Sequence, residues 1–280
     1  MRTTQPGYGV VVPEERARRN VGPSADDGFY LTDTATGRCR MLVSIKDMVE
    51  RANPAIQSGD LSRQEIYGFH SKFNPQSTHL MLSLRWFPAL EKRRWDMFAV
   101  DYREVRYAWI TMPLDASVMH CAVGPEQWDK GGHHGTFFPD GEHISMNLAI
   151  DRDVLRFVQV NFDGSGLRKM RDDTVGSGHP TVHRNGTHLL TDTYEGESMA
   201  YGDGTIPLRW IELATGKEQA LVRMNIRQPH AQGALRIDPH PAWDRTWRYV
   251  TFNGSLGGTR RVFVADMGPV LSLSGVSAVR

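Results

Sequence analysis

The stretch His179-Pro-Thr-Val-His-Arg-Asn-Gly-Thr-His-Leu-Leu-Thr-Asp-Thr193 aligns without a gap with three other stretches of the chain. They are His70-Ser-Lys-Phe-Asn-Pro-Gln-Ser-Thr-His-Leu-Met-Leu-Ser-Leu84, His134-Gly-Thr-Phe-Phe-Pro-Asp-Gly-Glu-His-Ile-Ser-Met-Asn-Leu148 and His240-Pro-Ala-Trp-Asp-Arg-Thr-Trp-Arg-Tyr-Val-Thr-Phe-Asn-Gly254. Each begins with a histidine and has a turn sequence between two apolar positions. The first position is Phe73, Phe137, Val182 or Trp243, and the second is Leu80, Ile144, Leu189 or Val250. A short apolar strand, a tight turn and an alternating strand predict a β-hairpin at each stretch.

Further strands follow these hairpins. Residues 156–166 and 209–216 each indicate a third strand, a turn and a fourth strand. Four antiparallel strands in every repeat are typical of the blades of a β-propeller. The sequence therefore predicts an all-β fold, a β-propeller with four-stranded antiparallel blades.

The repeats account for about four and a half blades in a chain that we expect to form a single domain, 1–280. Residues 29–45 predict half a blade, 46–65 an inserted helix or a long loop, and 66–280 four blades, with a protruding loop at 86–101. A closed propeller usually needs more blades, because an open end leaves sheet faces and strand edges in water. Three alternatives stay open: further strands in the weak N-terminal part, a ring that is not closed, or pairing with another copy as a homo-oligomer.

Composition excludes several classes of partner. The 33 basic and 32 acidic residues leave a net charge of +1, which gives no bulk electrostatic reason to expect nucleic acid or a membrane surface. Cys39 and Cys121 form no disulfide framework and have no zinc-ribbon spacing. Since no apolar run is long enough to cross a bilayer and no signal-peptide core is seen, we expect a cytoplasmic protein.

The histidines that open the repeats are the strongest functional signal. The first strand of each propeller blade lines the central channel, so His70, His134, His179 and His240 are expected to converge at one opening. Convergent imidazoles form a metal site or acid–base machinery; the alternative is that histidine caps a strand or fills a packing slot. His79, His143 and His188 share a later repeat position and are assigned to structure, and His183 to a solvated turn.

Asp238 lies two residues before His240, and on an extended strand such side chains share a face. With His179 from the neighbouring blade they predict a three-ligand site for a divalent metal, Mn²⁺ first, with Zn²⁺ or Ca²⁺ as alternatives. His230 and Gln232 precede this blade and could also reach the opening.

Other polar residues surround the same opening. His133 lies in Gly131-Gly-His-His-Gly135, where glycine permits close approach of a ligand to the backbone. Tyr194 is a candidate proton donor, and Arg209 could hold a carboxylate with a bidentate fork. The alternative is that Tyr194 ends a strand and Arg209 is a surface cation.

Three motifs carry a family resemblance. Gly131-Gly-His-His with Phe-Pro-Asp-Gly, Gly178-His-Pro with Leu-Thr-Asp-Thr-Tyr, and Asp238-Pro-His-Pro-Ala-Trp resemble the β-propeller polysaccharide lyases of the oligogalacturonate lyase type, with ulvan lyases as more distant relatives. The resemblance covers roughly residues 66–267. Pro-Asp-Gly turns also occur in non-catalytic propellers of the TolB kind.

The resemblance implies His134 as Brønsted base and His179 and His240 as metal ligands. The family's Gln-x-x-His-x-His motif departs here, with Leu235 at the glutamine and Asp238 at the first histidine, so that Gln232 or His230 would supply the missing contact. Arg106 is the nearest match to the family's catalytic arginine.

The chemistry implied is β-elimination on a uronic-acid-containing oligosaccharide. A cation would neutralise the substrate carboxylate, neutral His134 would take the C5 proton, Tyr194 would protonate the leaving oxygen, and His70, His133 and His230 would contact substrate. The alternative function is a non-catalytic TolB-like binding or scaffold propeller. A hydrolase ranks last, because it requires two facing carboxylates.

Overall fold

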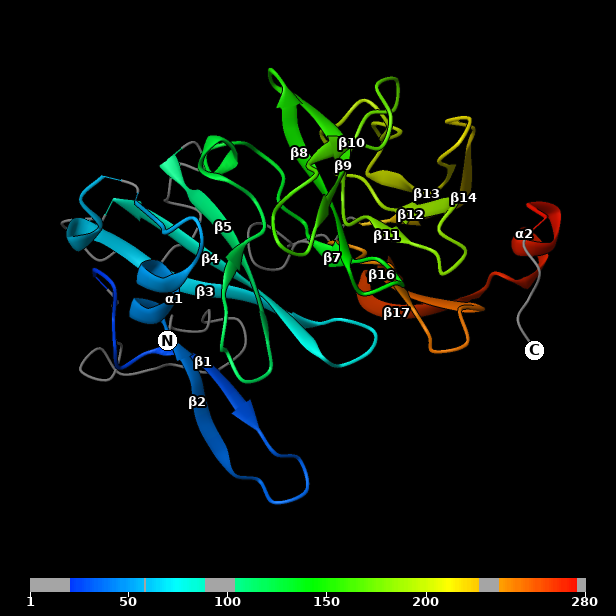
Figure 1. The fold of residues 1–280 in the computed structure, drawn as a ribbon. Coiled ribbons are helices and arrows are strands. Elements are labelled where there is room, and N and C mark those ends of the chain that lie inside the picture. Colours follow the sequence, from blue (N-terminus) through cyan, green and yellow to red (C-terminus); the bar gives the residue numbers. More distant parts are fainter. Residues whose placement is uncertain (1–20, 58, 89–103, 227–236, 276–280) are drawn as a thin grey trace. The chain divides into compact units, whose positions relative to one another are not determined.

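The computed structural model describes residues 21–57, 59–88, 104–226 and 237–275 (Figure 1). The chain divides into two compact units, one made of Met1–Lys130 with Asn161–Ser165 and the other of Gly131–Val160 with Gly166–Arg280. Each is described by itself below, and the single domain expected from the repeats stays a prediction. Among the described residues, neither helix has the length and apolar character needed to span a bilayer.

The first unit contains a two-stranded and a four-stranded antiparallel sheet. Its elements are β1 (Gly28–Thr32), β2 (Cys39–Ser44), α1 (Ile45–Arg51), a 3-10 turn (Leu61–Arg63), β3 (Gln64–Phe73), β4 (His79–Pro88), β5 (Arg106–Pro113), β6 (His120–Cys121) and a second 3-10 turn (Pro125–Gln127). The strands β1 and β2 form the predicted half blade, and β3 to β6 pair in chain order as the first full blade.

Ser44 is the N-cap of helix α1: its hydroxyl accepts the backbone N–H of Asp47 at 3.0 Å, and the Asp47 carboxylate accepts the backbone N–H of Ser44. The helix is much shorter than the segment 46–65 for which a helix or loop was expected. Another expectation is wrong: Trp86 and Phe87 do not start a protruding loop but belong to β4 and are 2% exposed. Residues 89–101 of that predicted loop lie outside the described residues.

The second unit holds three blades. Their elements are β7 (Thr136–Phe137), β8 (His143–Asp151), β9 (Val154–Asn161), β10 (Arg168–Lys169); β11 (Thr181–Val182), β12 (His188–Thr191), β13 (Thr205–Glu212), β14 (Glu218–Asn225); and β15 (Ala242–Trp243), β16 (Tyr249–Leu256), β17 (Thr259–Asp266), followed by α2 (Gly268–Leu273). Within the described residues, the sheet of the last blade has three strands, and helix α2 follows β17 where the repeat predicts a fourth strand.

The predicted hairpin is present in each of the four repeats. The apolar pairs read from the sequence are Cα partners across the first two strands of each blade: Phe73 with Leu80, Phe137 with Ile144, Val182 with Leu189, and Trp243 with Val250. Side chains at the turns fix this register. In the second repeat Asp140 Oδ1 accepts the backbone N–H groups of Glu142 and His143 at 2.8 and 3.0 Å.

The core of the second unit lies between neighbouring sheets. One buried cluster joins Phe157 of β9 to Val182, Leu189 and Ile211 of the next blade, and another joins Leu208 and its neighbours to residues of β16. Each blade therefore buries a face against the next, which is how stacked antiparallel sheets remove apolar area from water. The fold is all-β, of the β-propeller class.

Candidate metal and acid–base site

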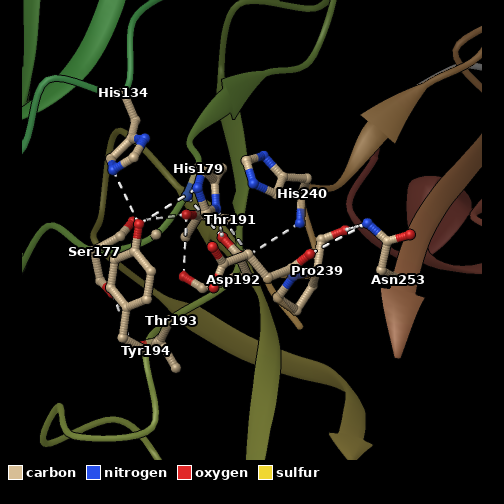
Figure 2. Close-up of polar contacts among 12 residues, drawn as sticks. His134, Ser177, His179, Thr191, Asp192, Thr193, Tyr194, Pro239, His240 and Asn253 are labelled. Carbon is tan, nitrogen blue, oxygen red and sulfur yellow. Dashed lines mark hydrogen bonds and ion pairs between the residues drawn. The ribbon is translucent and has the colours of Figure 1, made fainter. Parts of the chain in front are cut away.

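Three of the four repeat-opening histidines come together in the second unit (Figure 2). His134 precedes β7, His179 precedes β11 and His240 precedes β15, so each lies at the entrance to a blade. The ring centroids of His134 and His179 are 4.4 Å apart, and those of His179 and His240 are 3.5 Å apart. The predicted convergence is thus present for these three residues, which lie 45 and 61 positions apart in the sequence.

Glycine is required directly before His179. Gly178 has φ +60°, and a Cβ there would lie 2.3 Å from both the backbone oxygen and Oδ1 of Asp192. The carbonyl of Gly178 accepts the Asn147 side-chain amide at 2.7 Å, which ties this turn to the preceding blade. The close approach of backbone to Asp192 holds His179 beside that carboxylate.

Asp192 is a buried carboxylate that contacts both His179 and His240. It directly follows β12 and is 1% exposed. Its oxygens accept hydrogen bonds from the His179 ring Nδ1 at 3.0 Å, the His179 backbone N–H at 2.7 Å and the His240 backbone N–H at 3.1 Å. Burial alone would raise the pKa of the Asp192 carboxyl, but the hydrogen bond and the charge of His179, with the two backbone amides, outweigh burial and lower the pKa. A buried carboxylate therefore fixes two of the three histidines.

The sequence reasoning assigned no role to Asp192. It directly follows the apolar strand residues of Leu-Thr-Asp-Thr-Tyr, and a charged side chain at such a position is seldom buried unless it has partners. That pattern was the signal available.

His179, Asp238 and His240 form a group able to hold a metal ion, because one ligand atom from each lies within 4.8 Å of the others. Asn253 supports the segment before His240: its Nδ2 donates to the Asp238 carbonyl at 3.2 Å, and its backbone N–H donates to the Pro239 carbonyl at 2.8 Å. Two imidazoles and a carboxylate suit Mn²⁺ or Zn²⁺ better than Ca²⁺, which prefers oxygen ligands alone.

The hydrogen bond from His179 to Asp192 completes this donor set. A metal-binding imidazole commonly donates its second nitrogen to a carboxylate, which fixes the ring and makes the other nitrogen a better ligand. In His179, Nδ1 faces Asp192, which leaves Nε2 for a cation. The residues present therefore fit a divalent metal.

The Tyr194 hydroxyl lies between two of the histidines. Its oxygen is 2.9 Å from His134 Nε2 and 3.4 Å from His179 Nε2. The Glu197 carboxylate anchors the loop that carries it, accepting the Tyr194 backbone N–H at 3.2 Å and the Thr193 hydroxyl at 2.6 Å, and it also accepts the Ser177 hydroxyl. These contacts hold the phenol against the imidazoles.

Arg209 contacts other parts of the fold and none of the three histidines in the contacts that are seen. It is 1% exposed, and its guanidinium makes two 2.8 Å hydrogen bonds to Glu218 on β14 while donating to the Val175 carbonyl at 3.2 Å. The alternative of a surface cation is therefore wrong. Its predicted grip on a substrate carboxylate stays a prediction, and the contacts seen here link strands of the fold.

Other residues were also predicted to belong to this site. His133 is 2% exposed, with φ +71°, and its backbone N–H donates to the Asn147 carbonyl at 2.8 Å. His70 on β3 and Arg106 at the start of β5 belong to the first unit. His230, Gln232 and Leu235 lie outside the described residues. The roles proposed for all of these stay predictions.

The three histidines that were assigned to structure make local contacts, as expected, but the expectation for His183 is wrong. His143 pairs with Asp140 at 2.8 Å, His79 lies beside the Thr78 hydroxyl at 2.9 Å, and His188 stacks on Trp210. His183 is not solvated: it is 3% exposed and packs against tryptophan rings. Its turn is covered by residues far along the chain, which the local sequence does not show.

No protein-family model and no curated protein matches the sequence. Among solved structures, TolB from Acinetobacter baumannii has a TM-score of 0.52 at 11% identity, over 85% of this chain and 45% of that chain. A putative TolB from Agrobacterium tumefaciens has a TM-score of 0.50 at 12% identity, over 89% and 67%. An oligogalacturonate lyase from Vibrio parahaemolyticus has a TM-score of 0.49 at 12% identity, over 86% and 72%. This chain thus spans less than half of the first of these proteins. At such identities the likeness concerns the fold alone, and that fold is a TolB-like β-propeller.

Proposed function

We propose that the second unit carries the active site of a metal-dependent lyase that cleaves uronic-acid-containing oligosaccharides by β-elimination. The observation that carries the proposal is the position of the Tyr194 hydroxyl, within reach of His134 on one side and of His179, a member of the metal-ligand group, on the other. β-Elimination on a uronate requires a base, an acid and a cation close together, and this site brings candidates for all three together.

The expected protonation states of Tyr194 and His134 suit elimination. A tyrosine hydroxyl ordinarily carries its proton at pH 7, so Tyr194 donates to His134 Nε2, which is then an unprotonated acceptor. His134 takes the proton from C5 of the uronate, the electron pair forms the C4–C5 double bond, and the C4–O bond breaks. Tyr194 gives its proton to the departing oxygen, and the proton held by His134 returns to Tyr194 along their 2.9 Å contact.

His179, Asp238 and His240 would hold the metal, Mn²⁺ first and Zn²⁺ second. A divalent cation bound there would polarise the substrate carboxylate and acidify the C5 proton. Asp192 keeps the His179 ring fixed for this task, and the Asn253 contacts hold the segment that carries Asp238 and His240. The partner is thus an acidic oligosaccharide, and no covalent intermediate on the protein is needed.

The test is the ultraviolet absorbance of the unsaturated product after incubation with oligogalacturonate or ulvan fragments, with Mn²⁺ and with a chelator. We expect product only with metal, and a loss of at least about 100-fold in kcat for Tyr194→Phe and for His134→Gln. His143→Gln is the matched control, since His143 lies at an exposed turn and pairs with Asp140.

Two results would contradict the proposal. One is the absence of product from every uronate glycan while the protein still binds metal, which favours the alternative of a non-catalytic TolB-like binding protein. The other is unchanged activity in Tyr194→Phe.

A further inference from the structure

One position of the repeat carries a polar side chain in all four copies. It lies thirteen residues after the opening histidine, and we call it the clamp position. Its members are Ser83 on β4, Asn147 on β8, Asp192 directly after β12 and Asn253 on β16. Identical positions in a repeat become equivalent positions in space, so these side chains occupy corresponding places in their blades.

In the blade β11–β14, Asp192 joins the starts of two neighbouring blades. Its carboxylate accepts the backbone N–H of His179, which opens its own blade, and the backbone N–H of His240, which opens the next one. In the last blade Asn253 donates its side-chain amide to the Asp238 carbonyl at 3.2 Å, two residues before His240. The clamp position therefore binds the backbone beside the opening histidines.

Asn147 makes the corresponding contacts one blade earlier. Its backbone carbonyl accepts the backbone N–H of His133 at 2.8 Å, and its side-chain Nδ2 donates to the Gly178 carbonyl at 2.7 Å. His133 directly precedes His134, and Gly178 directly precedes His179. The asparagine is 0% exposed, so water does not compete for these hydrogen bonds. One buried residue thus holds the backbone next to two of the converging histidines.

A glycine lies against the clamp residue in both of these blades. Gly132 has φ +106°, and a Cβ there would lie 2.3 Å from the Asn147 carbonyl oxygen and 2.8 Å from its Oδ1. Gly178 approaches Asp192 in the same way, with 2.3 Å to each of the corresponding atoms. Backbone packed this closely leaves no space for the segment before His134 to move towards β8. The position of His134 therefore depends on that of Asn147.

The clamp residues connect the three histidines in series. Asn147 connects the starts of the blades opened by His134 and His179, and Asp192 connects those opened by His179 and His240. At the same position in the first unit, Ser83 Oγ has no hydrogen-bond partner among the described residues. The blades that the clamp position joins are thus the blades whose histidines come together, with ring centroids 4.4 and 3.5 Å apart (Figure 2).

We propose that Asn147 is a positioning residue that sets the distance between His134 and His179. Asp192 and Asn253 hold the metal-ligand group, whereas Asn147 holds the proposed base beside that group. A displacement of about 1 Å can cost about 100-fold in rate, so such a residue affects turnover without touching the substrate. Its part in catalysis rests on the proposed function, but its effect on the distance between the two imidazoles does not.

The test replaces Asn147 by aspartate in the full chain. The variant keeps the shape and the backbone carbonyl, but it removes the N–H donor and places a carboxylate against the Gly178 carbonyl. The distance is followed by the nuclear Overhauser effect between the ring protons of His134 and His179, in metal-free protein labelled at its histidines. We expect this cross-peak in the native protein and its loss in Asn147→Asp. Asn147→Ser, whose side chain is too short to reach Gly178, should lose it as well.

Turnover and metal affinity give a second comparison. In Asn147→Asp the kcat on a uronate substrate should fall about 10- to 100-fold. The Mn²⁺ affinity should stay at the native value, because Asp192 and Asn253 still hold the ligands. Asn74→Asp is the matched control: Asn74 is also buried, 4% exposed, and its Nδ2 donates to the Thr78 hydroxyl at 3.0 Å within a turn of the first unit. It should leave the cross-peak, the kcat and the Mn²⁺ affinity unchanged.

Folding is checked by circular dichroism. A cross-peak of native intensity in the folded Asn147 variants would overturn the proposal, as would its absence from the native protein or its loss in Asn74→Asp. Failure of both Asn147 variants to fold would assign Asn147 to the stability of the fold and overturn it likewise. A fall in Mn²⁺ affinity as large as the fall in kcat would also contradict it, because Asn147 would then hold the metal ligands. If the native protein cleaves no uronate, the proposed function fails, and the cross-peak alone decides whether Asn147 sets the distance.

Discussion

Replacing Asp192 by asparagine tests how much the buried carboxylate contributes to the site while His179 and His240 stay unchanged. In the native protein the two carboxylate oxygens receive the His179 ring, the His179 amide and the His240 amide. The variant keeps one of these oxygens and places an NH₂ group at the other, where it meets a backbone or ring donor. The volume of the side chain barely changes, so the effect reports on charge and hydrogen bonding.

The expected loss follows from the bonds broken. Each hydrogen bond to a charged group contributes about 1.5 to 3 kcal/mol, and the substitution removes at least one of them and takes the charge from the acceptor of the others, so Asp192→Asn should lower the free energy of unfolding by roughly 2 kcal/mol or more. Since Asp192 also orients a predicted ligand, Mn²⁺ affinity should fall about 10- to 100-fold. A variant that only destabilised the fold would leave the affinity of the folded fraction unchanged.

Urea unfolding gives the first quantity, and titration of metal-stripped protein with Mn²⁺ well below the unfolding midpoint gives the second. Asp140→Asn is the control: Asp140 likewise accepts hydrogen bonds from a histidine ring and two backbone N–H groups, but at an exposed turn, and its partners Glu142 and His143 are not metal-ligand candidates. It should cost less than about 1 kcal/mol and leave Mn²⁺ binding intact. Equal Mn²⁺ affinity in both variants would refute the reasoning.

Two further predictions concern the stability of the fold. Burial lowers the pKa of His183 below its ordinary value of 6.5, so the unfolded chain binds the proton more readily than the folded chain. The stabilisation by the neutral ring is present above pH 6.5 and is lost as the pH falls below it. His183→Phe should therefore flatten the decline in the free energy of unfolding between about pH 7 and pH 5. A decline as steep as that of the native protein would contradict this. Arg209→Met should lower the free energy of unfolding by about 2 kcal/mol, because the Val175 carbonyl loses its donor and Glu218, whose side chain is 35% exposed, loses its ion-pair partner, whereas Arg223→Met, which breaks an exposed pair with Asp203, should cost less than about 1 kcal/mol. Equal losses in the two arginine variants, measured by denaturant unfolding, would count against the structural role of Arg209.

The hairpins were predictable because their determinants are local. Apolar residues seven positions apart, separated by a turn that Asp140 or Asn74 can stabilise with its own side chain, leave one register that buries the apolar positions. The convergence of His134, His179 and His240 was predictable for a related reason: identical positions in a repeat become equivalent positions in space.

Other features were beyond sequence reasoning. Nothing near Trp86 indicates that Trp86 and Phe87 belong to β4, and nothing after β17 indicates that a helix follows where a fourth strand is expected. In both cases the packing of the segment, rather than its own composition, decides the structure.

The sequence by itself determined the repeat, its hairpins and the convergence of His134, His179 and His240, because all of these depend on spacing within and between the repeats. Only the tertiary structure decided what surrounds them: that Asp192 holds two histidines, that the Tyr194 hydroxyl lies between His134 and His179, and that Arg209 is occupied by Glu218. These contacts join separate blades or separate strands of one blade, and which donor meets which acceptor depends on how buried groups share a limited number of partners.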